Sequence, residues 1–383
     1  MAFLHYFIKK LIYFTLHIFW IVPIRKNRIF LLNELSFKYG DNLKYINEYL
    51  NEHLKKTYDV IFPLTNKNEA LDNDLKYVKP FSLSYFIFLI SSSVIITNAG
   101  GVSYIPIRKK QLVINTWHGG GPYKKTGGAL FQDKWYLKEL KMQKKNVKYM
   151  VSSCKICTEK ENKSMLYEND SCLPFGMPRN DIFFDTTLLL RKKIFDLYDI
   201  ADHVKIVLFA PTFRSNPTDF TDSKKYHVSD MDYEKLLEVL KHKFGGYWQL
   251  AIRLHPKLKN EVIDVANAVN FTNYPDMQEL LYISDVVITD FSSLMWDFSL
   301  TNRPCFLYAD DIDEYERERG FYMSSKKWPY PIARNNAELI NNIATFDLEK
   351  YRKDVANHHK ECGSYEKGIA CESIVNMIKT NLE

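Results

Sequence analysis

The stretch that decides the fold is Asp285–Asp297, with the sequence DVVITDFSSLMWD. It opens with an apolar, β-branched run, Val286–Thr289, which is typical of a buried strand, and this run stops at Asp290. Two serines follow, Ser292 and Ser293, and apolar residues then recur at helical spacing. A strand that enters a helix through a short polar turn leaves backbone N–H groups of the first helical turn without partners. Those donors and the helix dipole suit a phosphate oxygen, although a serine at this place is also a frequent helix N-cap.

The same alternation of strands and helices runs through the chain from residue 27 onward. Strands are predicted at 28–33, 58–64, 94–97, 112–117, 148–152, 205–210, 249–254, 285–289 and 305–308. Helices are predicted at 42–55, 82–92, 232–243, 277–283 and 293–299. The alternation occurs on both sides of a turn-rich segment near residues 176–185. A chain of 383 residues also exceeds what one core usually serves. We therefore predict an α/β fold of two doubly wound parallel-sheet domains that face each other across a cleft.

The net charge of +6 is modest, and the positive excess is concentrated in one region. Residues 123–148 contain only two acids, Asp133 and Glu139, against eight lysines at positions 124, 125, 134, 138, 141, 144, 145 and 148. One region of the chain is therefore basic, not the protein as a whole, and we expect no nucleic-acid partner.

The six cysteines do not suggest a disulfide framework in a chain of this length. Cys154 and Cys157 form a CxxC, but no second pair stands at the spacing of a zinc site. We expect reduced thiols in a cytoplasmic protein and no structural metal.

The first 24 residues are apolar and aromatic apart from Lys9, Lys10 and two histidines, and three cations follow at positions 25, 26 and 28. The uninterrupted apolar part, residues 11–24, is too short to span a bilayer comfortably. One interpretation makes residues 1–26 a membrane-associating helix that lies in the inner leaflet, on the cytoplasmic face, as a peripheral anchor. The other makes the segment a helix packed against the body of the protein.

Polar side chains follow several of the predicted strands at the point where each strand ends. They are His118, Arg214, Arg253, His255, Asp290, Ser292 and Ser293. The carboxyl ends of parallel strands lie along one edge of an open sheet, and ligands bind at that edge. Each residue alone has an ordinary structural explanation, such as a turn or a surface ion pair. Together a cation, an imidazole, hydroxyls and a helix N-terminus predict a pyrophosphate site in the second domain.

His118 is followed by three glycines that form neither GxGxxG nor a P-loop. Glycine-rich backbone beside a histidine permits close approach of a substrate to the imidazole. A histidine near its ordinary pKa can accept a proton from an attacking hydroxyl. The alternative is a loop histidine with a structural role.

These residues also carry a resemblance. The run Thr116-Trp117-His118-Gly119, with Lys124, Lys125 and Gly127, resembles the TWHGTPLKKIG signature of the CDP-glycerol glycerophosphotransferase family, the teichoic-acid primases and polymerases. Further similar motifs follow in the family's order, at residues 39–46, 176–181 (GMPRND), 210–214 (APTFR), 253–256 (RLHP), 289–297 and 308–322. The resemblance covers about residues 27–322. The main departure is at residues 119–123, where the family usually has Thr-Pro-Leu after the first glycine, and this puts the acceptor in question.

The resemblance implies a GT-B fold and the transfer of a polyol phosphate from a CDP-linked donor, with release of CMP. It implies an N-terminal acceptor-side domain at 27–183 and a C-terminal donor-binding domain at 184–383. His118 is then the candidate base or acceptor-orienting group, with His255 as a second candidate catalytic residue. The donor diphosphate is expected at Arg214, Arg253, His255, Asp290, Ser292 and Ser293, and the acceptor side at Gly119, Gly120, Lys124 and Lys125. The acceptor is expected to be a lipid-linked or polymeric glycan or polyol phosphate.

No cofactor and no metal are expected, because the proposed donor site offers no paired carboxylates at strand ends. Two other functions remain open from the sequence. One is a sugar transferase of the same fold that uses a nucleotide-sugar. The other is a non-enzymatic membrane-surface protein, which leaves the polar groups at the strand ends unexplained.

Overall fold

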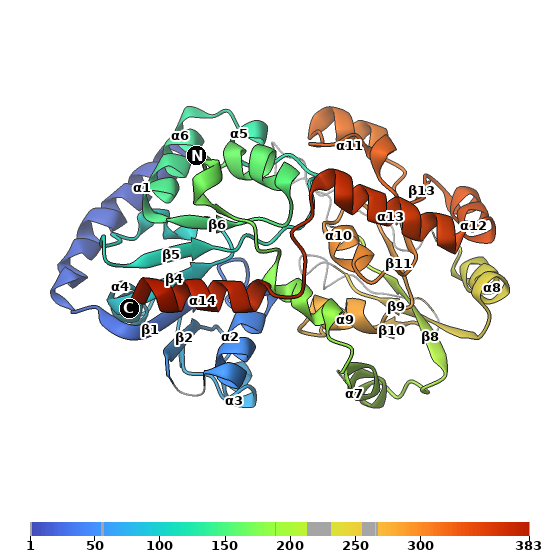
Figure 1. Cartoon of the computed structure of the whole chain (residues 1–383), viewed down its shortest axis with the longest axis horizontal. Coiled ribbons are helices and arrows are strands. Elements are labelled where there is room, and N and C mark those ends of the chain that lie inside the picture. Colours follow the sequence, from blue (N-terminus) through green and yellow to red (C-terminus); the bar gives the residue numbers. More distant parts are fainter. Residues whose placement is uncertain are drawn as a thin grey trace. The chain divides into compact units, whose positions relative to one another are not determined.

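A computed structural model of the chain describes residues 2–54, 57–187, 189–212, 231–254, 265 and 267–382 (Figure 1). The chain divides into two compact units. The first unit comprises Met1–Phe184 together with Gly363–Glu383, and the second comprises Asp185–Cys362. Each unit is built around its own parallel sheet.

The sheet of the first unit has the strand order β3-β2-β1-β4-β5-β6-β7, and every pair is parallel. The strands are β1 Arg25–Leu32, β2 Asp59–Pro63, β3 Tyr77–Val78, β4 Ser92–Thr97, β5 Leu112–Asn115, β6 Tyr149–Val151 and β7 Cys172–Leu173. The chain moves outward from β1 to β3 and then returns to place β4 on the other side of β1. This reversal of strand order between β1 and β4 is the switch point at which α/β sheets bind ligands.

Helices and single turns connect these strands. They are α1 Ala2–Thr15, η1 Leu16–Ile21, α2 Asp41–His53, α3 Lys67–Asp72, α4 Leu83–Ser91, η2 Gly101–Tyr104, α5 Gly127–Leu130, α6 Lys134–Asn146, the π-helix η3 Cys157–Asn162, η4 Asn169–Ser171, η5 Pro178–Phe184 and α14 Ala370–Leu382. Side-chain caps fix where two of them begin. The Ser82 hydroxyl accepts from the backbone of α4, and the Asp133 carboxylate accepts from the backbone of α6.

The sheet of the second unit has the order β10-β9-β8-β11-β12-β13, again parallel throughout. Its strands are β8 Val204–Phe209, β9 Tyr247–Ile252, β10 Val269–Asn270, β11 Val286–Thr289, β12 Cys305–Tyr308 and β13 Ile332–Ala333. Its helices are α7 Leu190–Leu197, α8 Tyr233–Phe244, α9 Met277–Ile283, α10 Leu294–Ser299, α11 Ile312–Glu318, η8 Ser325–Lys327, α12 Asn336–Ala344 and α13 Leu348–Cys362. Here the strand order reverses between β8 and β11.

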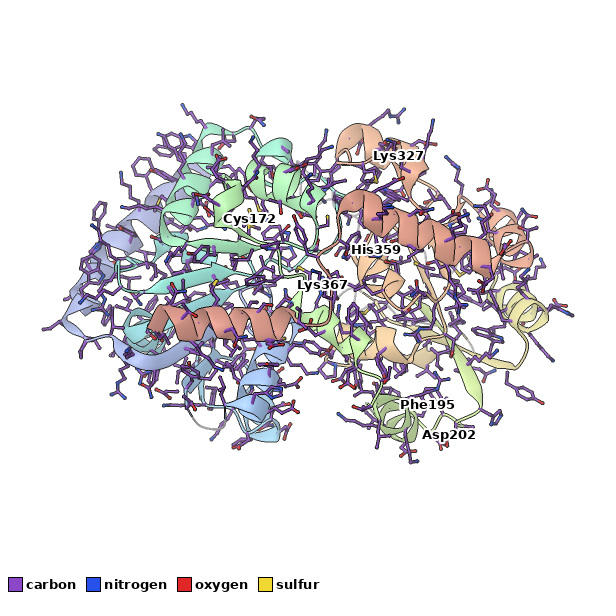
Figure 2. The ribbon with its side chains drawn as sticks, in the orientation of Figure 1. Cys172, Phe195, Asp202, Lys327, His359 and Lys367 are labelled. Carbon is purple, nitrogen blue, oxygen red and sulfur yellow. The ribbon has the colours of Figure 1, made fainter. Side chains whose placement is uncertain are left out.

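Aromatic side chains and a neutral histidine fill the core beside α10. Trp296 is fully buried, and its ring lies 4.3 Å from the ring of His359. Figure 2 labels His359 on α13. The His359 Nε2 atom lies 2.7 Å from the Ser299 hydroxyl. Burial lowers the pKa of His359 to about 4, so the ring is uncharged at neutral pH. This contact anchors α13 on α10.

The sequence predictions of regular structure are confirmed, since each predicted strand and helix overlaps an element of the same type. The strand predicted at 112–117 ends two residues early, at Asn115. The reason is local, because Trp117 has a φ of 57° and its N–H donates to the Asn115 side chain.

The predicted domain 184–383 is wrong at its C-terminal end, because residues 363–383 belong to the first unit. The Asp181 carboxylate accepts from the backbone N–H groups of Ala370 and Cys371, at 3.0 and 2.8 Å. The Glu366 carboxylate accepts from the N–H of Met177 at 3.0 Å. These bonds hold the N-terminus of α14 and the residues before it against residues 177–181, close to the point where the chain leaves the first unit.

All six cysteines lie in the described part of the chain, and there each is a buried free thiol. Among the described residues, no helix combines the length and the apolar character that crossing a bilayer requires.

Candidate active site

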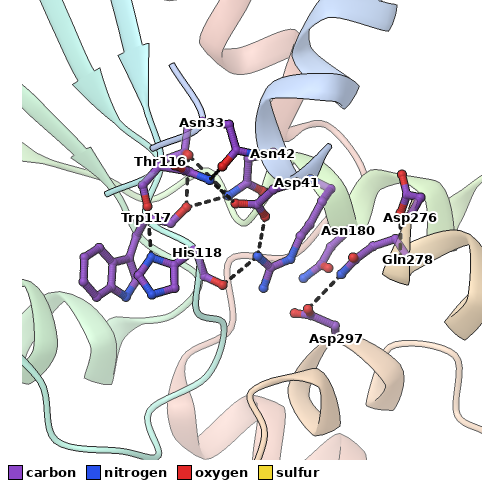
Figure 3. A network of polar contacts seen from close by, with 12 residues as sticks. Asn33, Asp41, Asn42, Thr116, Trp117, His118, Asn180, Asp276, Gln278 and Asp297 are labelled. Atoms are coloured by element: carbon purple, nitrogen blue, oxygen red, sulfur yellow. Dashed lines mark hydrogen bonds and ion pairs between the residues drawn. The ribbon is translucent and has the colours of Figure 1, made fainter. Parts of the chain in front are cut away.

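Three loops meet at the switch point of the first sheet. They follow β1, β4 and β5, and they bring Asn33, Asn98 and Thr116–His118 together (Figure 3). The Asn98 amide donates to the Asn33 side chain at 3.0 Å, and both residues are buried. The parallel pairing of β1, β4 and β5 brings these residues, which are far apart in sequence, to one edge.

The backbone of the loop after β4 fixes the ring of His118. Its Nδ1 lies 3.0 Å from the Asn98 carbonyl oxygen. A carbonyl can only accept, so Nδ1 carries the proton and the Nε2 lone pair remains available. Burial lowers the pKa of His118 below its ordinary value. The imidazole is therefore neutral at physiological pH, which is the state that a proton acceptor requires.

Arg179, on η5, holds the loop that carries His118. Its Nη1 donates to the Asp41 carboxylate and to the His118 carbonyl oxygen, each at 2.7 Å. The Asn98 amide donates to the other oxygen of Asp41 at 2.7 Å. The chain of contacts thus runs from Asn98 through Asp41 and Arg179 back to His118, as Figure 3 shows for the labelled members.

Asn42 connects this network to the end of β5. Its amide donates to the Trp117 carbonyl oxygen at 2.8 Å, and its side-chain oxygen accepts from the N–H of Arg179 at 3.1 Å. The side chain is fully buried, so each bond replaces contact with water and contributes to a single loop geometry.

The sequence did not predict Asp41, Asn42, Asn98 or Arg179 as functional residues. Three of them stand inside the motifs at 39–46 and 176–181, and Asn98 directly follows a buried strand. Position after a strand was the usable signal for Asn98. For Arg179 the motif was the only signal, because its partners lie 61 and 138 residues away along the chain and no local pattern reports them.

The glycines after His118 have different structural requirements. Gly121 has a φ of 73° and donates its N–H to the Ser153 hydroxyl at 3.1 Å. Gly119 has no such constraint, since a Cβ there would meet only ordinary contacts with the Trp117 ring. Gly120 is buried, whereas Lys124 and Lys125 are half-buried. The structure therefore places all four predicted acceptor-side residues on the loop that leaves His118.

Glu161 lies beneath this loop and was not predicted from the sequence. Its Oε1 accepts from the Trp117 indole at 3.2 Å and from the Thr126 hydroxyl at 3.4 Å. The Trp117 ring in turn lies 4.2 Å from the His118 ring. Burial raises the pKa of the Glu161 carboxyl to about 7. The residue sits on the π-helix η3, a form of helix often found at functional sites.

In the second unit Asp290 joins two strand ends. Its side chain is fully buried, and its Oδ2 accepts from both the N–H and the hydroxyl of Thr212, at 2.9 and 2.8 Å. The Thr289 hydroxyl donates to the Ala210 carbonyl at 2.7 Å. These bonds tie the loop after β8 to the loop after β11, which agrees with a role for Asp290 in shaping the turn.

Ser292 and Ser293 stand between β11 and α10, half-exposed. The Ser292 hydroxyl accepts weakly from the N–H of Leu294, at 3.4 Å. Within the described part of the chain, the Ser293 hydroxyl makes no capping bond to α10, although Ser293 occupies the N-cap position. The capping interpretation therefore does not account for Ser293.

Arg253 directly follows β9, and its guanidinium is half-buried with Nη1 3.3 Å from the sulfur of Met277. Burial lowers its pKa, and the nearby Asp276 opposes this shift. Because β9 and β11 flank β8, Arg253 and the two serines lie on one edge of the sheet, as predicted. Arg214 and His255 lie outside the described residues, so their placement stays a prediction.

The described residues contain no group of three or more metal-ligating side chains. The expectation that no metal is used stays a prediction.

The two sheets and their polar switch points define an α/β enzyme of the GT-B-like class. The chain superposes on the structure of the wall teichoic acid polymerase TagF with a TM-score of 0.82, at 24% identity, over 94% of this chain and 90% of that chain. The predicted fold class is confirmed.

Residues 14–380 match the model of the family described as CDP-Glycerol:Poly(glycerophosphate) glycerophosphotransferase. The chain belongs to this family and is an enzyme of the glycerophosphotransferase type.

Two relatives show the range of the family. The chain is 29% identical to the teichoic acid glycerol-phosphate transferase of Staphylococcus aureus, over 97% of this chain and 98% of that protein. It is 25% identical to the teichoic acid poly(ribitol-phosphate) polymerase of Bacillus spizizenii, over 90% of this chain but only 55% of that protein.

Proposed function

We propose that this enzyme transfers glycerol phosphate from CDP-glycerol to a hydroxyl group of a teichoic-acid acceptor. Support comes from the family and from the end-to-end similarity to a glycerol-phosphate transferase of S. aureus. A relative that polymerises ribitol phosphate is less similar and much longer than this chain. Glycerol is therefore the polyol that we propose.

In the proposed reaction, the acceptor oxygen forms a bond to the phosphorus that carries glycerol. The bond between this phosphorus and the bridging oxygen of the diphosphate breaks, and CMP leaves with that oxygen. The hydroxyl proton passes to Nε2 of His118. Proton transfer to a positioned base of this kind contributes about 10²–10⁴-fold to a rate.

The observation that carries this assignment is the state of His118. Its Nδ1 proton is committed to the Asn98 carbonyl, its pKa is lowered by burial, and its backbone is held by Arg179. A loop histidine with a merely structural role does not require the combination of these three features. Nothing else on the loop offers a neutral nitrogen lone pair.

On the donor side, the diphosphate is assigned to Arg253 and the Ser292 and Ser293 hydroxyls, with Asp290 as a positioning residue. Arg253 brings a positive charge, and the serines bring hydroxyl donors, since the Ser292 oxygen accepts in its bond with α10. Arg214 and His255 complete this set as predicted from the sequence.

The test is release of CMP by the purified protein, with CDP-glycerol, CDP-ribitol and a nucleotide-sugar offered in turn. CMP release and growth of the acceptor only with CDP-glycerol are expected. His118→Ala should lower turnover by about 10²–10⁴ and change donor affinity little. His53→Ala, at an exposed histidine of the same unit, is the control. Release of a nucleoside diphosphate from a nucleotide-sugar would establish the sugar transferase instead.

The acceptor is proposed to be lipid-linked, and the enzyme to lie on the cytoplasmic face of the membrane. The helix α1 packs on α6, where Phe3, Tyr6 and Phe7 surround Trp135, and Lys9 pairs with Glu139. Its other face is apolar and exposed, with Leu4, Ile8, Leu11 and Phe14, and the exposed Ile18 and Ile21 follow on η1. Both interpretations of the N-terminus thus describe part of it, a packed helix with an unpacked apolar face.

The neighbouring helix α6 supplies the matching charge. Its exposed lysines and the one that follows, at positions 134, 138, 141, 145 and 148, recur at spacings of four and three, which places them on one side. Apolar side chains beside a row of cations suit a membrane surface that contains anionic lipids.

This attachment is tested with the double substitution Leu11→Ser and Ile18→Ser. We expect it to reduce sedimentation with vesicles that contain phosphatidylglycerol while CDP-glycerol binding persists. Leu71→Ser with Leu83→Ser, two comparably exposed leucines on α3 and α4, is the matched control. Equal loss of vesicle binding in the two variants would refute the role of α1.

A further inference from the structure

A pocket of about 560 Å³ opens between α1 and α6 in the first unit. This volume lies within the range of small-molecule sites in proteins. Its lining combines apolar side chains, Phe14 and Met142, with the hydroxyls of Tyr6 and Tyr13 and the cations Lys10 and Lys145. None of these residues takes part in the proposed transfer.

The charge in the pocket is positive. Lys10 comes from α1 and Lys145 from α6, where its ammonium lies 5.9 Å from the centre of the Tyr13 ring. Both lysines are largely exposed and so keep their charge accessible to a ligand. Two ammonium groups beside aromatic rings and a methionine select an anion that is attached to an apolar body.

A buried hydroxyl of this pocket is unsatisfied. Ser103, on the turn η2, is fully buried and lines the pocket, and among the residues that the structure describes its Oγ has no hydrogen-bond partner. The Asn146 amide donates to the carbonyls of Val102 and Ile105, at 2.6 and 2.8 Å, and so fixes the turn that presents Ser103. An unpaired buried hydroxyl costs free energy, and a phosphate oxygen would satisfy it.

The position of the pocket indicates where the apolar part of the ligand lies. Phe14 contributes to the lining and also belongs to the exposed apolar face of α1 with Leu11, next to Ile18 of η1. A ligand whose phosphate reaches Lys10, Lys145 and Ser103 therefore has a continuous apolar surface for its chains.

We propose that this pocket binds the headgroup phosphate of one anionic membrane lipid, whose acyl chains lie along the apolar face of α1. The lipid would fix α1 on α6 and set the depth of the enzyme in the membrane surface. This inference rests on the membrane attachment proposed above, but it concerns a stoichiometric site and not general attraction to a charged surface.

The test uses dihexanoylphosphatidylglycerol below its micelle concentration, with binding to the full-length protein followed by calorimetry. We expect saturable binding of one molecule, with dihexanoylphosphatidylcholine and inorganic phosphate each at least about ten-fold weaker. Lys10→Ala with Lys145→Ala should weaken binding of the anionic lipid at least about ten-fold. Ser103→Ala should weaken it about five-fold, the equivalent of one hydrogen bond.

The matched control is Lys134→Ala with Lys141→Ala, which removes the same charge from exposed positions of α6 outside the pocket. Both double variants should lose vesicle binding to a similar extent, whereas only the pocket variant loses the monomeric lipid. Equal loss of monomeric lipid in both pairs, equal binding of the two lipids, or inorganic phosphate binding as tightly as the lipid would overturn the proposal. Because the assay contains neither donor nor acceptor, failure of the proposed transfer reaction would leave its result unchanged.

Discussion

Replacing Glu161 by glutamine should change how stability depends on pH. Glutamine keeps the shape of the side chain and an oxygen that can accept from Trp117 and Thr126. What it removes is a titrating carboxyl that is 6% exposed. The variant therefore isolates the effect of ionising a group in this buried place.

The expected magnitude follows from the pKa. Burial raises the pKa of Glu161 from 4.5 to about 7, so the folded protein binds a proton that the unfolded chain releases near pH 4.5. The carboxyl stabilises the fold while it is protonated, and this contribution is lost as the pH rises from 4.5 to 7. Between pH 5.5 and pH 8 the wild type should lose about 2 kcal/mol relative to Glu161→Gln.

Urea unfolding followed by circular dichroism at both pH values measures this difference. Comparison of the two proteins at each pH cancels the other titrating groups. Glu159→Gln, an exposed glutamate on the same π-helix, is the control and should show no such change. A difference between Glu161→Gln and wild type that is equal at pH 5.5 and pH 8 would refute the burial of this carboxyl beneath the His118 loop.

Four further outcomes are expected. In a pH–rate profile, kcat/KM should decline on the acid side with an apparent pKa below 6.5, because burial lowers the pKa of His118. The variant His118→Asn should lack this acid-side decline. Arg179→Lys should lower kcat about 10²-fold with little change in the Kd of CDP-glycerol, since the lysine cannot hold both Asp41 and the His118 carbonyl; an unchanged kcat would contradict this. Asp290→Ala should destabilise the second unit by about 1–3 kcal/mol in denaturant unfolding, because it removes the buried carboxylate that accepts from the N–H and hydroxyl of Thr212. Transfer from CDP-glycerol should persist in EDTA, and activity that vanishes on chelation and returns with Mg²⁺ would overturn the metal-free site.

The sheets could be predicted from the sequence because buried strands are short apolar runs and the helices between them have their own period. Position at strand ends predicted His118 at the carboxyl edge of the first sheet, and Arg253 and the two serines at the carboxyl edge of the second. That rule depends only on local pattern and on topology, so it needs no knowledge of tertiary contacts. The functional roles of these residues stay predictions.

The contacts that hold the site could not be predicted in this way. Arg179 pairs with Asp41 across 138 residues, and Asp181 binds the start of α14 across 189 and 190 residues. No periodicity reports such a pairing. The return of residues 363–383 to the first unit follows from the second of these contacts, and so the predicted domain boundary at the C-terminus was wrong.

Within the first unit, the cations that hold the proposed site differ from the cations that we propose to meet a substrate. Arg179 is 5% exposed, and its guanidinium donates to Asp41 and to the His118 carbonyl. It therefore orders the loop and is poorly placed to bind a phosphate. Lys124 and Lys125 follow the glycines on that same loop and are half-buried, so their ammonium groups are better placed to meet an anionic acceptor. The exposed lysines of α6 and the apolar face of α1 belong to this unit as well. A donor such as CDP-glycerol is soluble, whereas a lipid-linked acceptor stays at the membrane. The unit that carries His118, the proposed base, is thus also the unit that carries the proposed membrane-binding surface, and this is the arrangement that a membrane-bound acceptor would require.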